Sequence, residues 1–324
     1  KDESVKRLVF LTVLSAFTPT PINLFLKGES SIGKTYNVIQ SLQFFDEEIS
    51  KKHVWLLGGL SPTALVHSKA DFIDSQGYVV DWADKPSREK VKQELRDFYH
   101  GTDTKITRER VKNHLQQGNK EWDKRISEGH YEVDLTDKIL VFLDAPHIET
   151  FNRLRPILSH DAEEISYRFT DKTGRGRLQT THVVIKGWPA TIFCSSEETF
   201  VKDLATRSFN VTPETSKAKL SAALDVTAEK RVNPWKFDRD EKWVKLESYL
   251  RWWVRAVKDY RCLVPYAREL KELFPLYGAR VMRDFDHFLT LIEVAALFRF
   301  CQRPLIKRGR EKIVLATFED FGTI

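Results

Sequence analysis

Short apolar runs alternate with amphipathic stretches over the first part of the chain, up to about residue 210. The runs lie at residues 22–26, 53–59, 139–144 and 190–196, and they are rich in β-branched and aromatic residues. Runs this apolar are typical of strands that are covered on both faces of a sheet. The alternation therefore predicts an α/β fold with a mostly parallel sheet flanked by helices.

Two segments interrupt this pattern inside residues 1–210. A charged stretch over about residues 82–130 has helical spacing and mixed charge signs, so it predicts a solvated helical insert, with direct contact to DNA as the alternative. Residues 165–187 alternate on either side of a charged, glycine-containing turn and predict a β-hairpin.

After residue 210 the pattern becomes helical, and residues 211–324 predict an α-helical second domain. The first strand that we expect in this part is residues 312–317. Trp252 and Trp253 occur at helical spacing beside basic residues. We predict that they are buried in the core of this domain and do not stack on bases.

One further apolar run, Leu8–Phe17, has basic residues before it and a Thr-Pro-Thr-Pro segment after it. A bilayer-spanning helix needs roughly 20 apolar residues, and a signal peptide would end at a small-residue cleavage site. The run therefore predicts a buried helix and no association with a membrane.

Composition narrows the function classes only a little. The 324 residues include 52 Lys and Arg against 46 Asp and Glu, and the net charge of +6 is compatible with a nucleic-acid partner without requiring one. Cys194, Cys262 and Cys301 have neither metal-ligand nor disulfide spacing, which favours a reduced, cytoplasmic compartment. Because an initiator Met is lacking, we expect a piece of a longer protein.

The segment GESSIGKT fits the phosphate-binding pattern G-x-x-x-x-G-K-[ST], and it lies between a predicted strand and a predicted helix. In that setting backbone N–H groups and a helix N-terminus converge on phosphate. Lys34 would reach the β- and γ-phosphates of ATP, and the Thr35 hydroxyl would ligate Mg²⁺. The alternative is a glycine-rich turn before a helix. The expected ATP-binding residues are Gly28, Glu29, Ser30, Ser31, Ile32, Gly33, Lys34 and Thr35.

Asp144 follows the apolar run that begins at Ile139, which is a Walker B pattern and supplies a second Mg²⁺ ligand. The alternative is an Asp that only caps the next turn. With the phosphate loop upstream, we favour the metal ligand.

These segments together resemble the AAA+ core of replicative DNA helicases, of the viral and mobile-element superfamily three and of the minichromosome-maintenance type. The resemblance rests on PINLFLKGESSIGKT, GGLSPTALVH and KILVFLDAPH, and it covers roughly residues 5–210 and 275–320. It implies an ATP-dependent DNA translocase that acts as a ring, most simply a hexamer, with single-stranded DNA in a central pore. Such a motor would serve replication of a mobile element or virus-like replicon. Two alternatives are an AAA+ ATPase that loads or remodels a replication partner, and a P-loop small-molecule kinase.

The resemblance also implies roles for individual residues. The hairpin resembles the presensor hairpin, so its Lys172, Arg175 and Arg177 would contact DNA phosphates without sequence preference. An exposed basic hairpin without a partner is the alternative. Ser196, with Ser195 beside it, takes the position of sensor 1, where these families usually have Asn.

Two arginines complete the set of ATPase residues that the resemblance implies. Arg207 resembles an arginine finger that acts in trans on a neighbouring subunit, and the alternative is a cation that complements a helix C-terminus. Arg283 resembles sensor 2 on a lid helix, with Arg280 as the fallback. Arg283 lies near the predicted helix start, where a cation is unfavourable unless an anion binds there.

One expected group is missing. In these families the Walker B Asp is followed by a Glu that polarises the attacking water, but Asp144 is followed by Ala145. Either an engineered replacement of Glu traps ATP, which we favour because the other motifs are intact, or Glu149 substitutes. Both explanations predict a chain that binds ATP and hydrolyses it slowly.

Overall fold

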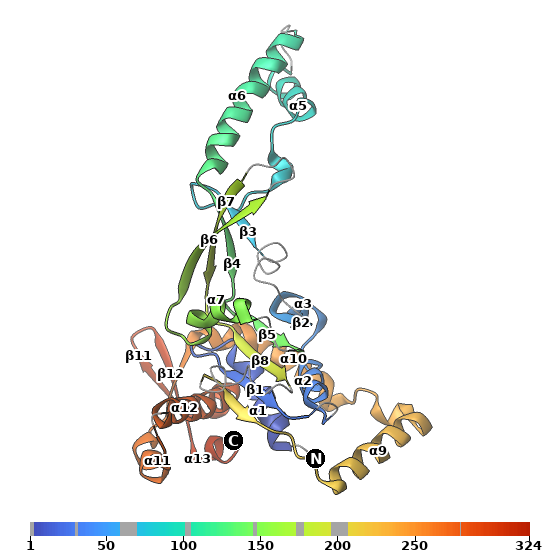
Figure 1. Ribbon diagram of the computed structural model, residues 1–324, viewed down its shortest axis with the longest axis vertical. Coiled ribbons are helices and arrows are strands. Elements are labelled where there is room, and N and C mark those ends of the chain that lie inside the picture. Colours follow the sequence, from blue (N-terminus) through green and yellow to red (C-terminus); the bar gives the residue numbers. More distant parts are fainter. Residues whose placement is uncertain are drawn as a thin grey trace. The chain divides into compact units, whose positions relative to one another are not determined.

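The computed structural model describes residues 3–29, 32–58, 70–100, 105–144, 148–172, 178–195, 207–278 and 280–324. These residues form two compact units (Figure 1). The first unit comprises Lys1–Pro62, Leu135–Glu163 and Gly187–Ile324, and the second comprises Thr63–Asp134 and Glu164–Lys186.

A five-stranded sheet lies at the centre of the first unit, and each of its neighbouring strand pairs is parallel. This confirms the predicted α/β fold with a parallel sheet. The four predicted runs provide four of the strands, and the fifth, β9, crosses the expected boundary at residue 210. The strand order is β2 (Val54–Leu57), β5 (Ile139–Phe142), β8 (Ala190–Ser195), β1 (Asn23–Lys27) and β9 (Phe209–Val211).

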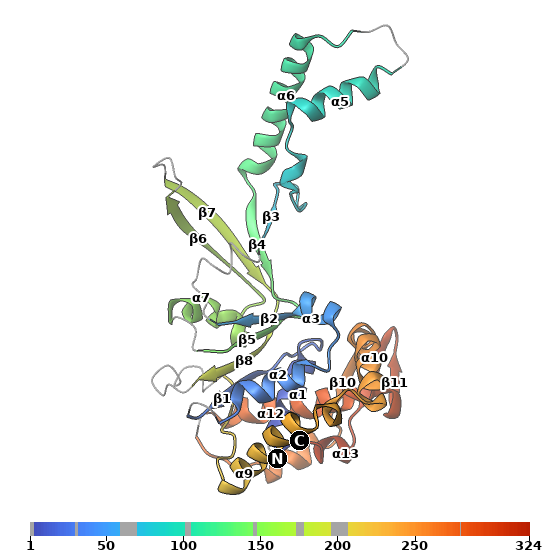
Figure 2. The same ribbon diagram turned by 90° about the vertical axis from the view of Figure 1, so that its right-hand side faces the viewer.

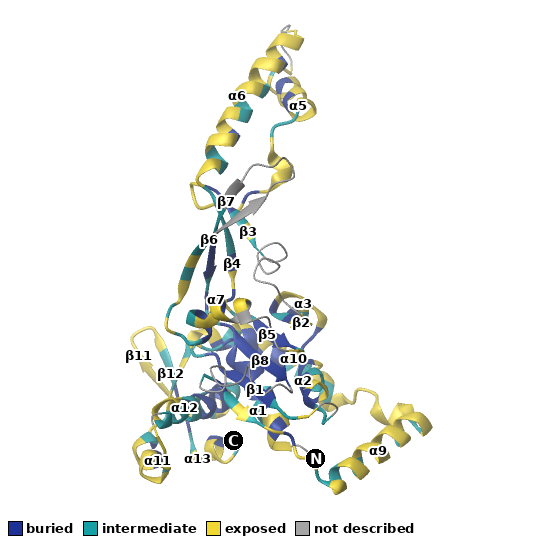
Figure 3. Ribbon diagram, viewed as in Figure 1, coloured by how far each residue is buried: buried dark blue, intermediate teal, exposed yellow. Residues whose placement is uncertain are grey.

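Helices from both halves of the chain share one hydrophobic core with this sheet (Figure 3). The run near the N-terminus forms the expected buried helix, with Val9, Val13 and Leu14 fully inaccessible. Since the same cluster includes residues of the C-terminal helices, no division between the units falls at residue 210. The described helices of the first unit, not all of which contribute to this core, are α1 (Glu3–Ser15), α2 (Lys34–Leu42), α3 (Glu47–His53), α7 (Ile148–Leu158), α9 (Lys217–Val232), α10 (Glu241–Ala256), α11 (Ala267–Leu273), α12 (Val281–Phe298) and α13 (Phe318–Phe321).

The C-terminal part is not purely helical, which corrects the prediction of no strand before residue 312. It contains a three-stranded sheet in the order β10 (Tyr260–Leu263), β12 (Glu311–Leu315) and β11 (Leu305–Arg308). The expected strand at 312–317 corresponds to β12. The other two strands are only four residues long, which is too short for a clear periodic signal in the sequence, and every residue of β11 is exposed.

The second unit combines the predicted insert and the predicted hairpin in one four-stranded sheet, visible in Figure 2. The hairpin strands β6 (Glu164–Lys172) and β7 (Leu178–Lys186) pair antiparallel, and β7 also pairs parallel with β4 (His130–Asp134). The edge strand β3 (Asp71–Ile73) completes the sheet and, like β4, was not predicted.

The insert itself contains α5 (Arg88–Phe98) and α6 (Arg108–Ser127), as its helical spacing predicts. Ser87 and Thr107 cap the two helices, each through a side-chain oxygen that accepts a backbone N–H. Val91, Leu95 and Val111 form a small buried cluster between them, while most other residues of both helices are exposed. The insert is therefore the solvated helical pair that its charge pattern predicts.

Within the described ranges, no helix combines the length and the apolar character needed to span a bilayer.

Two adjacent tryptophans of α10 differ sharply in burial. Trp253 is fully buried, its Nε1 donates to the Leu297 carbonyl at 2.8 Å, and its ring packs edge-on against Phe17 at 6.4 Å between centroids. Trp252 is 48% exposed, so the prediction of burial is right for Trp253 and wrong for Trp252.

Replacement of Trp253 with Ala tests the shared core. We expect the free energy of unfolding to fall by about 3–5 kcal/mol, because the cavity removes the contacts of Trp253 with Phe17 and with α12. The matched variant Trp252→Ala should lose only about 1 kcal/mol, since half of its surface is already in water. Urea denaturation followed by circular dichroism measures both, and equal losses would contradict the assignment of Trp253 to the core.

Candidate functional site

The segment from Gly28 to Thr35 joins β1 directly to α2, as a phosphate-binding loop does. Gly33 is the N-cap of α2 with a φ of 91°, a left-handed conformation that favours glycine. Gly28 has a φ of 141°, and a Cβ there would lie 2.3 Å from the Ile32 side chain. Both loop glycines therefore satisfy backbone requirements that other residues meet poorly.

Lys34 is the buried cation of this loop. Its Nζ donates to the carbonyl oxygens of Gly28 and Glu29, at 2.6 Å each. The N–H groups of the first turn of α2 have no acceptor within the helix, and they open toward the loop. The loop thus combines a fixed ammonium group with backbone N–H groups that the helix itself does not pair, which is the chemistry that binds phosphate.

The end of β8 lies beside this loop. In the sheet register Lys27 of β1 pairs with Ser195 of β8, and both strands end at the same edge. Burial raises the pKa of the Cys194 thiol to about 11, against the opposing effects of the Lys34 charge and of a side-chain hydrogen bond with Thr35. Cys194 is therefore a buried, protonated contact between β8 and α2.

Asp144 follows β5 at the same carboxyl edge of the sheet, and its side chain is exposed. Because β5 pairs with β8 and β8 pairs with β1, the Walker B strand and the phosphate loop are separated by one strand. Glu149 is exposed in the first turn of α7, which follows Asp144 in the chain. Ser30, Ser31, Ala145, Ser196, Arg175 and Arg177 lie outside the described residues, as does the side chain of Lys172 at the end of β6.

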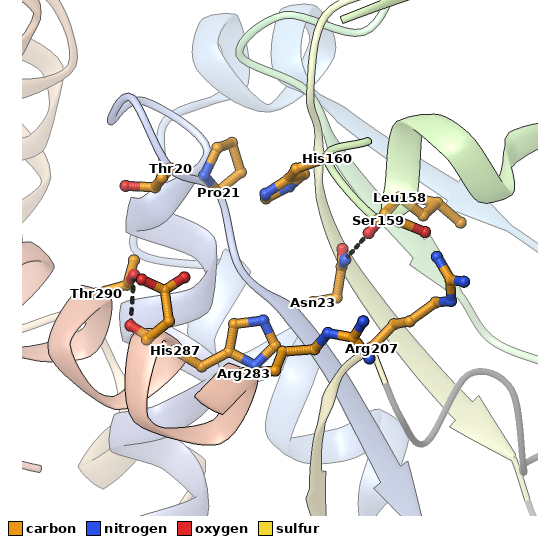
Figure 4. Close-up of a pocket in the computed structure, with 11 residues that line it drawn as sticks. Thr20, Pro21, Asn23, Leu158, Ser159, His160, Arg207, Arg283, His287 and Thr290 are labelled. Atoms are coloured by element: carbon orange, nitrogen blue, oxygen red, sulfur yellow. Dashed lines mark hydrogen bonds between the residues drawn. The ribbon is translucent and has the colours of Figure 1, made fainter. Parts of the chain in front are cut away.

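Arg207 and Arg283 line one cavity of about 150 Å³ (Figure 4). Arg207 precedes β9, its side chain is 14% exposed, and it lies 3.5 Å from the Asp161 carboxylate. Arg283 lies on the first turn of α12. Nothing in the sequence pattern predicts that these two residues line the same cavity. The cavity is lined by Thr20, Pro21, Asn23, Leu158, Ser159, His160, Arg207, Arg283, Asp286, His287 and Thr290.

This cavity lies at the opposite edge of the sheet from the phosphate loop. Asn23, which lines the cavity, begins β1, whereas Gly28 follows the end of the same strand. With a rise of about 3.3 Å per residue, the two residues are separated by roughly 16 Å along the strand. The arginines are thus distant from the phosphate loop of the same chain.

Arg280, the fallback for sensor 2, has a different position. Its Nε donates to the Asp284 carboxylate at 2.8 Å and its guanidinium also donates to the Ser208 carbonyl at 2.9 Å. It therefore anchors the start of α12 to the segment before β9 and does not line the cavity. The structure separates the two candidate arginines, which the sequence could not do.

Two histidines of the cavity were not identified from the sequence. In the described part of the chain, His160 Nε2 and His287 Nδ1 are buried without a hydrogen-bond partner. The His160 ring stacks on Trp188 at 5.0 Å, and the His287 ring lies 5.3 Å from Phe209. Burial, together with the nearby His287, lowers the pKa of His160 to about 4, and burial also lowers the pKa of His287. Both imidazoles are therefore neutral at physiological pH.

Comparison with known proteins adds no family to these observations. No protein-family model matches the chain, and no curated protein matches it significantly. The fold and the site define an α/β protein with a parallel sheet flanked by helices, an architecture compatible with a P-loop core.

The lowered pKa of His160 makes stability depend on pH. Between about pH 4 and 6.5 the unfolded chain binds a proton that the folded chain does not, so this contribution is present above pH 6.5 and is lost as the pH falls toward 4. The effect on the free energy of unfolding is at most about 3 kcal/mol. Urea denaturation at several pH values should show a smaller decrease for His160→Gln than for the parent chain. The exposed histidine variant His114→Gln should retain the full decrease, and equal slopes for all three chains would refute this assignment.

Proposed function

We propose that the chain is an ATP-dependent DNA helicase or translocase motor of the AAA+ type, acting as a ring, most simply a hexamer. It would work in the cytoplasm in the replication of a mobile element or virus-like replicon. The observation that carries the proposal is the position of two arginines at the edge of the sheet opposite the phosphate loop. A motor with shared sites between subunits needs this arrangement.

The carboxyl edge of the sheet supports ATP binding. The Walker A strand β1, the strand β8 with its sensor position, and the Walker B strand β5 are adjacent, so their ends converge where a γ-phosphate would lie. Thr35 and Asp144 offer exposed oxygen ligands of the type that Mg²⁺ prefers. Bound Mg²⁺ would neutralise charge on the phosphates, while Lys34 and the backbone donors hold them.

The amino edge supports a shared site. Arg207 and Arg283 line one cavity, and an arginine that stabilises charge during phosphoryl transfer must reach the γ-phosphate. Since each arginine is distant from its own loop, the phosphate would belong to a neighbouring copy. Contact between unlike surfaces of identical chains is heterologous, and such contacts close into a ring when the rotation permits it. In this proposal Arg283 acts in trans together with Arg207.

The hairpin β6–β7 would provide the DNA contacts through Lys172, Arg175 and Arg177, by charge and without sequence preference. A second candidate function is an AAA+ ATPase that loads or remodels a replication partner. The observation that favours it is the exposed helical pair α5–α6, which extends from the same sheet as the hairpin and offers a docking surface.

Restoring a carboxylate at position 145 tests the motor directly. We expect Ala145→Glu to raise ATP turnover by about 10²–10⁴-fold, since a general base is regained next to the metal ligand. Single-stranded DNA should stimulate this activity further, and the triple variant Lys172→Ala, Arg175→Ala, Arg177→Ala should lose the stimulation. A steady-state ATPase assay with and without DNA measures each effect. Equal turnover with Ala and Glu at position 145 would reject the assigned role, and turnover indifferent to DNA would favour the partner-remodelling function.

The shared site predicts complementation between two inactive variants. In the Ala145→Glu background, Lys34→Ala should abolish nucleotide binding and Arg207→Ala should lower turnover by about 10³-fold or more. In a mixture, an Arg207→Ala subunit supplies an intact loop and a Lys34→Ala neighbour supplies the intact arginine. We therefore expect the mixture to regain part of the activity that neither variant has alone. No gain over the separate variants, under conditions where the two chains assemble together, would place Arg207 outside the active site.

A further inference from the structure

Helix α9 exposes an unusual amount of apolar surface. It has 16 residues and none of them is buried. A helix of this length is only marginally stable on its own, because most helical stability in proteins comes from packing. Several of its apolar residues, together with those of the short turn Pro234–Phe237, are exposed, and Figure 3 colours most of α9 accordingly. They are Leu220, Leu224, Val226, Val232, Trp235 and Phe237, with Leu224 exposed to 71%.

Polar contacts hold this helix next to the phosphate loop. Ser216 caps its N-terminus, and Lys219 Nζ donates to the carbonyl oxygens of Ile32 at 3.4 Å and of Glu214 at 2.6 Å. Near the other end, Lys230 Nζ lies 5.8 Å from the centre of the Tyr36 ring on α2. The helix is thus anchored beside the nucleotide site by its lysines, while its leucines remain uncovered.

A second uncovered apolar surface lies between α11 and α12. Leu273, Leu276, Tyr277 and Met282 are exposed by 81%, 85%, 52% and 78%. Tyr277 also lines a hollow of about 390 Å³, and Leu273, Leu276 and Met282 are close in the chain to other residues that line it. Within the hollow, Arg280 and Asp284 pair with each other and leave the charge balanced. Such a hollow suits an apolar occupant. Its lining residues are Phe209, Asn210, Phe274, Tyr277, Arg280, Asp284 and Phe288.

The hollow is directly beside the arginine-lined cavity. Phe209 lines the hollow and follows Arg207 closely in the chain, and the exposed Met282 precedes Arg283. Figure 1 shows α9 and α11 at opposite sides of the first unit. The apolar surface of α9 therefore lies beside the phosphate loop, and the hollow between α11 and α12 lies beside the arginines.

We propose that α9 of one copy of this chain packs into the hollow between α11 and α12 of the next copy. This inference rests on the proposed ring. If the arginines of one copy reach the phosphate loop of its neighbour, then the helix beside that loop must come close to the surface beside the arginines. Leu220 and Leu224, one helical turn apart, present the apolar side chains that the hollow and its rim accept. The two surfaces differ, so the contact is head-to-tail and can continue around a ring.

Directed cross-linking tests the contact itself. In a Cys301→Ser background, one chain carries Leu224→Cys and a second carries Leu276→Cys. Mild oxidation of the mixture, in the presence of ATP, should give a disulfide-linked pair that contains one chain of each kind. Leu224→Cys alone should give far less product, because the contact joins unlike surfaces. A product formed as readily by Leu224→Cys alone, or no product from an assembled mixture, overturns the proposal.

Self-association gives the second measurement. Leu224→Asp should raise the dissociation constant for assembly at least about tenfold, measured by sedimentation velocity with ATP, because a charge replaces a buried leucine. Leu224→Ala keeps helix propensity and should have a smaller effect in the same direction. The matched control Val244→Asp changes a residue of α10 that is 52% exposed, and it should assemble like the parent chain. Circular dichroism confirms that each variant is folded.

The two proposals fail in different ways. If the chain assembles and Arg207→Ala complements Lys34→Ala, but Leu224→Asp associates as the parent does, the α9 contact is wrong and the shared site stands. If the chain remains monomeric with ATP at every concentration and the variants do not complement, the ring and the α9 contact are both wrong.

Discussion

Parallel pairing of the central strands is the constraint on which the other features of the first unit depend. In a parallel sheet all carboxyl ends lie at one edge and all amino ends at the other. The phosphate loop follows β1 and Asp144 follows β5, so both are at the carboxyl edge, whereas Arg207 precedes β9 and is at the amino edge. The register of β1 with β8 and β9 therefore separates the phosphate loop from the arginines within one chain.

The two halves of the first unit are connected by more than the sheet. Asp46 caps α3 by accepting the Ile49 N–H at 2.7 Å, and it also pairs with Arg251 of α10 at 2.5 Å. Burial acts to raise the pKa of Asp46, but the hydrogen bonds from Ile49 and Arg251 lower it overall, so the carboxylate stays charged. A buried carboxylate held in this way is costly to leave unpaired. The segment after the phosphate loop and the C-terminal helices are thus fixed to each other.

The sequence was sufficient for features that are local. Each of the four predicted strands is a continuous apolar run, and the phosphate loop is a contiguous motif whose glycines have the backbone conformations that the pattern requires. Features built from distant residues could not be predicted. His160, Arg207 and Arg283 meet only because α7, β9 and α12 end or begin at the same edge, and short strands such as β11 carry no periodic signal.

The pairing of β7 with both β6 and β4 has a mechanical consequence. The hairpin is joined to the rest of the second unit by strand pairing as well as by its loops. Four consecutive residue pairs connect β7 to β4, and β4 follows α6 closely in the chain. Hydrogen bonds between parallel strands resist a pull along the strand direction collectively, as a shear load, so they do not open one at a time. A displacement of β7 therefore also displaces β4 and the helix α6 that precedes it. The hairpin and the helical pair α5–α6 belong to one compact unit, so a force on either of them acts on both.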